Sequence, residues 1–284
     1  MPMVVEKKSN VFIIIPARHG STRLPGKPLL KIAGQSIIVR VATRAKQLEE
    51  KLLNNNKVNN VFLMVATDHE TISYEIKKIG IQAVMTSSEL KNGTERVFAA
   101  LKQFHNINEN DIIVNIQGDE PFFSIEDLEN LIIEMLNNKN VPMGTLAFPR
   151  NDPSLFLSSS VVKVVRDTNR FALYFSRSPI PFPKIEFDAL GKNWLVKAND
   201  LINKVEFLHH VGIYVFRYNS LCEYSNSSVD SQLEIVENLE QLRALEWGWK
   251  ILVIDASQEP FGIDTTEDLD KANLFALSLN EIKV

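Results

Sequence analysis

The start of the chain holds a basic loop whose residue types suit the binding of phosphate. Residues 7–48 include nine lysines and arginines and no acidic residue. Arg18, Arg23 and Lys27 lie with two glycines in the segment that follows the apolar run Val11–Ile15. Backbone amides of a glycine-containing turn can bond phosphate oxygens, while arginine and lysine neutralise their charge. We interpret the loop as a phosphate-binding segment; the alternative is that its cations are solvated surface residues.

The remaining cations of this stretch have no such context. We expect a solvated surface position for Lys7, Lys8, Arg40, Arg44 and Lys46. The loop itself is neither a P-loop, because five residues separate Gly20 from Gly26, nor a dinucleotide fingerprint, because the chain has no Gly-x-Gly pair.

Carboxylates occur at two other places where an apolar run ends or a helix begins. Asp119 and Glu120 follow the run Ile112–Ile116, and Asp264 precedes the last amphipathic stretch. One or two rigidly held carboxylates are the usual protein ligands of Mg²⁺, so Asp119 is a natural metal candidate. For Asp264 the spacing by itself favours a helix cap, a role that Thr265 could equally fill.

Other catalytic patterns are missing from the sequence. The five histidines lack the spacing of a zinc protease site, and His209 and His210 taken alone are typical of hydrogen-bonded structural residues. A single cysteine, Cys222, excludes an intrachain disulfide and is typical of a reducing compartment.

Composition narrows the class of protein further. The chain has 284 residues, of which 45% are hydrophobic and 23% charged, with a net charge of −4. These values are typical of a globular protein and disfavour a general nucleic-acid or membrane-surface binder. No apolar run approaches the length of a membrane helix, so we expect a cytoplasmic protein.

Short runs rich in branched residues alternate with amphipathic stretches through the first half of the chain. The predicted strands are Val11–Ile15, Val61–Ala66, Gln82–Met85, Ile112–Ile116 and Met143–Phe148, and the predicted helices are Ser36–Leu53, Glu70–Ile79, Gly93–Phe104 and Ile125–Leu136. This alternation is typical of parallel strands joined by crossover helices. We therefore expect an α/β fold, a three-layer sandwich with its ligand crevice at the carboxyl ends of the strands.

The pattern changes to short strand-like pieces between residues 149 and 217. We interpret 149–217 as an inserted β region within a single domain, 1–284, because consecutive strands there lack an intervening helix. Two polar stretches are predicted to be a linker and a surface loop, Asn54–Asn60 and Glu186–Glu206. The α/β pattern then resumes with a helix near Gln232–Trp247, a strand at Lys250–Ile254 and a helix from about Thr265.

Eight segments in order along the chain resemble the 3-deoxy-manno-octulosonate (Kdo) cytidylyltransferases, also called CMP-Kdo synthetases. They are residues 14–28 (IIPARHGSTRLPGKP), 66–69 (ATDH), 92–96 (NGTER), 115–121 (NIQGDEP), 172–177 (ALYFSR), 210–214 (HVGIY), 239–243 (LEQLR) and 262–265 (GIDT). Other sugar nucleotidyltransferases share the first segment, whereas the later ones are more specific to the Kdo enzymes.

The resemblance implies a reaction and a fold. The anomeric hydroxyl of Kdo would attack the α-phosphate of CTP, giving CMP-Kdo for lipopolysaccharide synthesis and pyrophosphate, with Mg²⁺ as cofactor. The fold would be a Rossmann-like nucleotidyltransferase sandwich with a mixed, mostly parallel sheet. Its inserted β region would form a homodimer.

The resemblance also assigns roles to individual residues. It implies that Arg18, Arg23 and Lys27 hold the triphosphate and that Gly93 and Arg96 line the cytosine side. It also implies that Asp119 and Asp264 bind Mg²⁺. The catalytic residues would be Lys27, Asp119 and Asp264. For the sugar it points to Gln117, Arg177, His210, Tyr214, Glu240 and Gln241. The chemistry is suitable, because an arginine can pair with the sugar carboxylate.

The chain also departs from the family pattern. Where the family has His-x-Ser-Gly-Thr-Glu-Arg, the segment 90–96 reads Leu-Lys-Asn-Gly-Thr-Glu-Arg, and Pro179 follows closely after Arg177. Three alternatives to a Kdo enzyme therefore stay open: a cytidylyltransferase for another sugar acid such as 8-amino-Kdo, a nucleotide-sugar glycosyltransferase, and a non-catalytic nucleotide-binding module. The chain lacks an Asp-x-Asp motif after Ile112–Ile116, which disfavours the glycosyltransferase, and it retains Lys27, Asp119 and Asp264, which disfavours the non-catalytic module.

Overall fold

The chain folds into two compact units in a computed structural model that describes residues 8–21, 23–185, 188, 206–227 and 229–279. Unit 1 comprises Met1–Lys139, Ile213–Asn226 and Pro260–Val284; unit 2 comprises Asn140–Gly212 and Ser227–Glu259. Unit 2 thus takes in the predicted insertion as far as Gly212 and adds segments on both sides of it.

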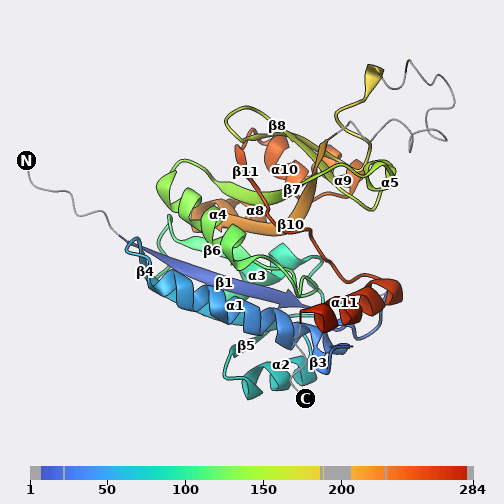
Figure 1. The fold of residues 1–284 in the computed structure, drawn as a ribbon. Helices are drawn as coiled ribbons and strands as arrows, with labels where there is room; N and C mark the ends of the chain where they lie inside the picture. The colour runs from blue at the N-terminus through green and yellow to red at the C-terminus, as the bar shows by residue number, and fades with distance from the viewer. Residues whose placement is uncertain (1–7, 22, 186–187, 189–205, 228, 280–284) are drawn as a thin grey trace, which may run out of the picture. The chain divides into compact units, whose positions relative to one another are not determined.

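Unit 1 is built on parallel strands in the order β6-β1-β4-β5 (Figure 1). The end of β10, residues 214–217, adds to β6 in the antiparallel direction, which makes the sheet mixed. The bounds are β1 Ser9–Ala17, β4 Val58–Thr67, β5 Gln82–Met85, β6 Ile112–Asn115 and β10 Phe207–Arg217.

Helices cover this sheet in two groups. Helix α1 contacts both α2 and α4, while α3 contacts α8 (Figure 1). The bounds are α1 Ile37–Leu53, α2 Glu70–Lys78, α3 Gly93–Leu101, α4 Ile125–Asn137, α8 Tyr218–Asn226 and α11 Thr266–Ser278. The predicted α/β sandwich with a mixed, mostly parallel sheet is confirmed.

The burial pattern explains why these segments form these elements. Every residue of β1 from Val11 to Ala17 is buried, as expected for a central strand that is covered on both faces. In α1 the buried side chains Ile37, Val41, Ala45, Leu48 and Leu52 recur every three or four residues. That spacing places them on one face of the helix, which packs on the sheet.

Two glycines set the backbone of the loops at the carboxyl ends of β1 and β6. Gly26 has φ +65° and begins a single helical turn, η1 (Lys27–Leu29). A Cβ on Gly118 would lie 2.7 Å from the Pro16 carbonyl oxygen, so only glycine lets the two loops approach this closely. The short hairpin of β2 (Lys31–Ile32) and β3 (Gln35–Ser36) follows the first loop and leads into α1.

Unit 2 contains the strands of the predicted insertion. Strands β7 and β11 pair in parallel, and β8 pairs antiparallel with β9 and with residues 208–209 of β10. The bounds are β7 Met143–Arg150, α5 Pro153–Leu157, β8 Lys163–Arg166, β9 Ala172–Ser176, α9 Gln232–Glu237, α10 Gln241–Glu246 and β11 Ile251–Asp255. Phe156, Val161 and Phe207 form a buried apolar cluster in this unit.

Several predicted elements differ from the observed ones. The single helix predicted near Gln232–Trp247 is wrong: α9 and α10 are separate, because Asn238 takes a left-handed conformation with φ +51° and ends α9. Strand β4 begins at Val58 and shortens the predicted Asn54–Asn60 linker, and α8 was not predicted. The predicted loop Glu186–Glu206, apart from Asp188 and Glu206, lies outside the described residues.

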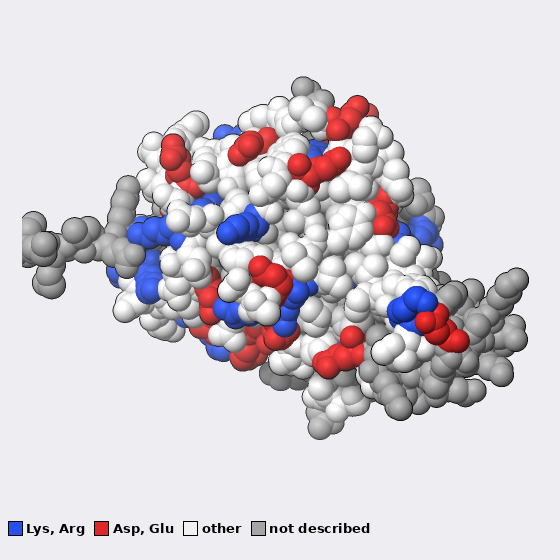
Figure 2. All heavy atoms as spheres, turned by 90° about the horizontal axis from the view of Figure 1, so that it is seen from above, with Lys and Arg blue, Asp and Glu red and all other residues white. Residues whose placement is uncertain are grey.

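Charged side chains of both signs are interspersed on the molecular face seen in Figure 2. This distribution accords with the small net charge of −4. Among the helices that the structure describes, none combines the length and the apolar character needed to cross a bilayer.

Candidate active site

A cavity of about 380 Å³ in unit 1 lies where β1 and β6 end. Eight of the residues singled out from the sequence line it: Arg18, Arg23, Lys27, Gly93, Arg96, Gln117, Asp119 and Asp264. Lys91 and Asn92, from the segment that departs from the family pattern, line it too. The structure therefore brings the predicted triphosphate, cytosine and metal residues together in one hollow.

Lys27 is the centre of a charged cluster in this cavity. Its Nζ donates to Asp119 Oδ2 at 2.5 Å, to the Ile263 carbonyl oxygen at 2.7 Å and to Asp264 Oδ1 at 2.9 Å. Burial opposes the charged form of Lys27, but the attraction of the two carboxylates outweighs it and raises the lysine pKa. The ammonium group is therefore fully charged at neutral pH.

Asp264 does not cap helix α11, which corrects the role that spacing alone favoured. Thr265 is the N-cap: its hydroxyl accepts from the Asp268 backbone N–H at 3.2 Å, and the Asp268 carboxylate accepts from Thr265 N–H at 2.9 Å. This reciprocal pair satisfies the helix end and leaves the Asp264 carboxylate to pair with Lys27 and with Arg23 Nη1, at 3.0 Å. Burial opposes ionisation of Asp264, but these two cations lower its pKa.

The carboxylate oxygens around Lys27 are of the kind that binds a magnesium ion. Asp119 and Asp264 come from separate loops, which the Ile263 backbone N–H joins by donating to the Asp119 carbonyl at 3.0 Å. Carboxylates are the hard oxygen ligands that Mg²⁺ prefers. Within the described parts of the chain, no three His, Cys, Asp or Glu side chains are grouped as a metal site. Mg²⁺ would therefore draw its remaining ligands from phosphate and water.

Glu120 is a site residue to which the sequence assigned no role. Burial, followed by the negative charges of Asp119 and Asp264, raises its pKa to about 8. The side chain is therefore mostly protonated at pH 7, and it keeps a third negative charge out of the cluster. The sequence shows that Glu120 is next to Asp119, but it does not show the burial that raises the pKa of Glu120.

Arg96 is almost fully buried and braces two loops at the rim of the cavity. Its guanidinium bonds Asp68 Oδ2 at 3.1 Å and Thr86 Oγ1 at 2.5 Å, with 2% of its surface exposed. The other oxygen of Asp68 accepts from the His19 backbone N–H at 2.9 Å, in the phosphate loop. Asp68 lies in the quoted segment 66–69, but the sequence gave it no role.

The start of α3 keeps its shape despite the departure from the family pattern. The Asn92 side chain caps the helix by accepting from the Glu95 backbone N–H at 2.8 Å. Asparagine and serine are both favoured at this position, so Asn92 does the work expected of the family's serine. A Cβ on the next residue, Gly93, would lie 3.2 Å from Pro16 and 3.3 Å from Gln117, so a glycine lets α3 begin close to both residues.

The predicted sugar-binding residues are divided between the units. Gln117 and Tyr214 belong to unit 1, where Tyr214 pairs with Asn115 across the sheet and Gln117 Nε2 bonds the Asn115 side chain at 3.4 Å. The unit 2 residues are Arg177, His210, Glu240 and Gln241; Glu240 is the N-cap of α10 and Gln241 is its first residue. Both His210 and Gln241 are buried.

Arg177 is anchored by backbone carbonyls of unit 2. Its Nε donates to Glu237 O at 2.8 Å, Nη1 to Ser159 O at 2.9 Å and Nη2 to Asn238 O at 3.3 Å. A guanidinium has five N–H donors, so two remain beyond these three bonds. The anchoring fixes the plane of the group and leaves it able to bind a carboxylate.

His210 is held neutral inside unit 2. Its Nε2 lies 3.0 Å from Thr145 Oγ1, whose hydroxyl donates to the Val211 carbonyl at 3.1 Å, so the ring donates Nε2–H to Thr145. Burial, with a contribution from His209, lowers the pKa of His210 to about 3. The neutral ring therefore uses its one N–H donor on Thr145 and carries no positive charge.

This burial predicts an acid-sensitive stability. Because the pKa of His210 in the folded state is below the ordinary value of 6.5, its contribution is complete above pH 6.5 and is lost as the pH falls toward 3. Between pH 7 and pH 5 the share of His210 in this loss should be about 2 kcal/mol, measured as the difference between wild type and His210→Gln in urea unfolding. His210→Gln should remove that part of the pH dependence, whereas His105→Gln, at an exposed position, should retain it. Identical pH slopes for wild type and His210→Gln would contradict the assignment.

Comparison with known proteins agrees with the geometry. The sequence profile of the cytidylyltransferase family matches residues 12–251. The chain is 40% identical over 264 residues to the 3-deoxy-manno-octulosonate cytidylyltransferase of Thermodesulfovibrio yellowstonii, covering 91% of this chain and 95% of that protein. It is 39% identical over 264 residues to the Pasteurella multocida enzyme of the same name, covering 93% and 97%.

Solved structures show the same relationship. A CMP:2-keto-3-deoxy-manno-octonic acid synthetase complexed with CTP superposes with a TM-score of 0.79 at 35% identity, covering 96% of this chain and 100% of that one. A 4-diphosphocytidyl-2C-methyl-D-erythritol synthase from Anaerococcus prevotii, 14% identical, shares the fold with a TM-score of 0.55, covering 95% and 96%. The chain belongs to the cytidylyltransferase family, among the 3-deoxy-manno-octulosonate cytidylyltransferases.

Proposed function

We propose that the protein transfers CMP from CTP to the anomeric hydroxyl of Kdo, releasing pyrophosphate. The observation that carries the proposal is the cluster of Lys27, Asp119 and Asp264, which opens into a cavity lined by further cations. The names of the related enzymes and the CTP bound by a structural relative support the choice of substrates.

Unit 1 would hold the nucleotide. Arg18, Arg23 and Lys27 neutralise the triphosphate. Gly93 and Arg96 line the same cavity and would contact the cytosine ring. Catalysis then depends on holding the α-phosphorus in line with the sugar hydroxyl.

Asp119 and Asp264 would hold Mg²⁺ beside the phosphates. When bound, the ion stabilises negative charge on the phosphate oxygens and on the departing pyrophosphate. Lys27 contributes a second, permanent positive charge at the same place, because its pKa is raised.

The sugar residues of unit 2 would orient the acceptor. Arg177 pairs with the carboxylate of Kdo through its remaining N–H groups, and the neutral His210 and the polar side chains at the start of α10 read hydroxyl groups. We further propose that the protein works in the cytoplasm as a homodimer and supplies lipopolysaccharide synthesis, since a reducing compartment suits its single cysteine.

Removal of Arg177 should affect the sugar far more than the nucleotide. Arg177→Ala should raise the KM for Kdo about 100-fold and leave the KM for CTP within about twofold, because the lost pairing involves only the sugar. Arg166→Ala is the matched control, since Arg166 also donates to a carbonyl of unit 2, Val253 O, at 2.7 Å. An equal rise in both KM values would count against the assignment.

A panel of acceptors tests the substrate class. Kdo, 8-amino-Kdo and N-acetylneuraminate are each supplied with CTP and Mg²⁺, and kcat/KM is measured from pyrophosphate release. We expect Kdo to give the highest value by at least about tenfold, a difference of about 1.4 kcal/mol in transition-state binding. A higher value for 8-amino-Kdo would reassign the acceptor within the same reaction.

A further inference from the structure

Helix α11 contacts the loops that carry Asp119 and Asp264 and the hairpin that follows Lys27. It begins directly after Asp264, whose backbone N–H donates to the carboxylate of Asp268 in the first turn, at 3.1 Å. Further along the helix, Asn273 Oδ1 accepts from the Ala33 backbone N–H at 3.0 Å, in the hairpin that follows Lys27. Ala33 has φ +47°, an uncommon conformation for alanine that the bond to Asn273 holds in place.

The third link is a cluster of aromatic rings. Phe122, three residues after Asp119, packs edge-on against Phe261 and Phe275 with ring centroids 5.3 and 4.9 Å apart. Phe261, three residues before Asp264, stacks on Phe275 at 5.5 Å. Phe275 on α11 therefore joins the two loops that carry the carboxylates.

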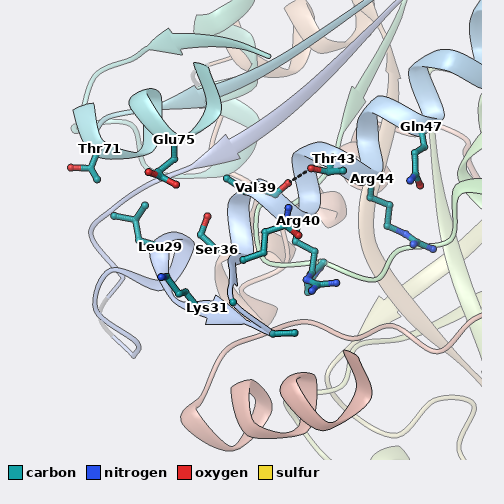
Figure 3. Close-up of a pocket in the computed structure, with 14 residues that line it drawn as sticks. Leu29, Lys31, Ser36, Val39, Arg40, Thr43, Arg44, Gln47, Thr71 and Glu75 are labelled. Carbon is teal, nitrogen blue, oxygen red and sulfur yellow. Dashed lines mark hydrogen bonds between the residues drawn. The ribbon is translucent and has the colours of Figure 1, made fainter. Parts of the chain in front are cut away.

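A buried cation extends the cluster to the hairpin of β2 and β3. Arg40, which sequence analysis placed on a solvated surface, is 8% exposed; its guanidinium lies over the Phe122 ring at 5.6 Å and donates to the Ile32 carbonyl at 3.2 Å. One turn further along α1, Arg44 donates to the Phe123 carbonyl oxygen. Both arginines line a pocket of about 980 Å³. Figure 3 shows them on one side of α1.

We propose that α11 is a clamp that sets the spacing of Lys27, Asp119 and Asp264, with Phe275 as its central positioning residue. This inference rests on the proposed function for the role of the cluster in holding Mg²⁺. Phe275 is 39% exposed, so its ring is only partly buried. Its two ring contacts add to the direct contact of Phe122 with Phe261, so three rings join the loop after β6, the loop before α11 and the helix itself.

The test compares two aromatic clusters of unit 1. Phe104 also packs edge-on against two rings, Phe12 at 5.1 Å and Phe62 at 5.4 Å, and it is likewise partly buried. Phe275→Ala and Phe104→Ala therefore each remove two ring contacts, and only the first lies beside the charged cluster. Leu274→Ala, at a 68% exposed position on α11, controls for the helix itself, and Phe275→Tyr retains the ring.

Two readouts follow each variant. The acylation rate of Lys27, read by peptide mass spectrometry on metal-free protein, should rise about fivefold in Phe275→Ala because the carboxylates no longer enclose the amine. The affinity for Mn²⁺ in the presence of CTP, measured by electron paramagnetic resonance, should fall about three- to tenfold. Phe104→Ala, Leu274→Ala and Phe275→Tyr should match the wild type in both.

The outcomes separate the clamp from the proposed function. Equal changes in Phe275→Ala and Phe104→Ala, or no change in either, would overturn the clamp, because the ring would then be an ordinary packing residue. If the wild type binds no Mn²⁺ with CTP, the metal part of the proposed function fails, and the Lys27 acylation rates alone decide whether α11 positions the cluster.

Discussion

Asp119→Asn is expected to reduce the rate of pyrophosphate release by about 1000-fold while leaving the fold intact. Asparagine keeps the shape of aspartate, and its side-chain oxygen can still accept from Lys27 Nζ. It lacks the negative charge that a divalent cation requires, so the nucleotide would bind without a correctly placed metal. The measurement is turnover at saturating CTP and Kdo over a range of Mg²⁺ concentrations.

The matched control is Asp270→Asn, an exposed aspartate on α11. Its turnover should equal that of the wild type, and all three proteins should have the same Tm within about 3 °C. Turnover of Asp119→Asn close to the wild-type value at millimolar Mg²⁺ would show that this carboxylate is not a metal ligand. Turnover that recovers only at much higher Mg²⁺ would confirm weakened metal binding as the cause.

Lys27→Met should produce opposite effects on catalysis and on metal affinity. The ammonium group occupies the space between Asp119 and Asp264, with bonds of 2.5 and 2.9 Å. Without it the two carboxylates repel each other, so the metal-free variant should be less stable by about 3 kcal/mol. The same pair should attract a divalent cation more strongly, and Mn²⁺ affinity without nucleotide should rise about tenfold.

Turnover of Lys27→Met should nevertheless fall about 100- to 1000-fold, because a permanent charge on the triphosphate is lost. Lys27→Arg keeps the charge. Its metal affinity and its stability should therefore change less than those of Lys27→Met. Adding Mg²⁺ to Lys27→Met should restore its Tm, which separates local repulsion from a general folding defect. Unchanged Mn²⁺ affinity in Lys27→Met would contradict a shared site for the ammonium and the metal.

The core of the candidate site could be predicted because it follows from sheet topology. Parallel strands end at one edge, so the loop after β1 and the segment after β6 must meet there, and the structure places Lys27 against Asp119 at that edge. Asp264 could not be resolved by spacing, since a helix cap and a metal ligand need the same residue type at the same place. The structure shows that the hydroxyl of Thr265 caps α11, so Asp264 is not the cap.

Other features depend on contacts that a one-dimensional pattern does not contain. Arginine usually lies on the protein surface, yet the guanidinium of Arg40 is buried between the Phe122 ring and the Ile32 carbonyl. The raised pKa of Glu120 likewise needs both burial and two carboxylates from distant parts of the chain. The break between α9 and α10 is set by one left-handed residue, Asn238, in an otherwise helical pattern.

The sequence predicted which residues bind the sugar, but it did not predict the contacts that hold them in place. Arg177 was predicted to bind a carboxylate, and the structure shows its guanidinium anchored on three backbone carbonyls. That anchoring could not be foreseen, because two of the three carbonyls belong to Glu237 and Asn238, about 60 residues further along the chain.

The most direct measurement is pyrophosphate release by the purified protein with CTP and Mg²⁺, with and without Kdo. Reaction type and acceptor are tested together, because hydrolysis of CTP alone would give release that does not depend on the sugar. We predict release that requires CTP, Mg²⁺ and Kdo, with one pyrophosphate formed for each CMP-Kdo. Well-folded protein that binds CTP but releases no pyrophosphate with Kdo would contradict the proposed reaction.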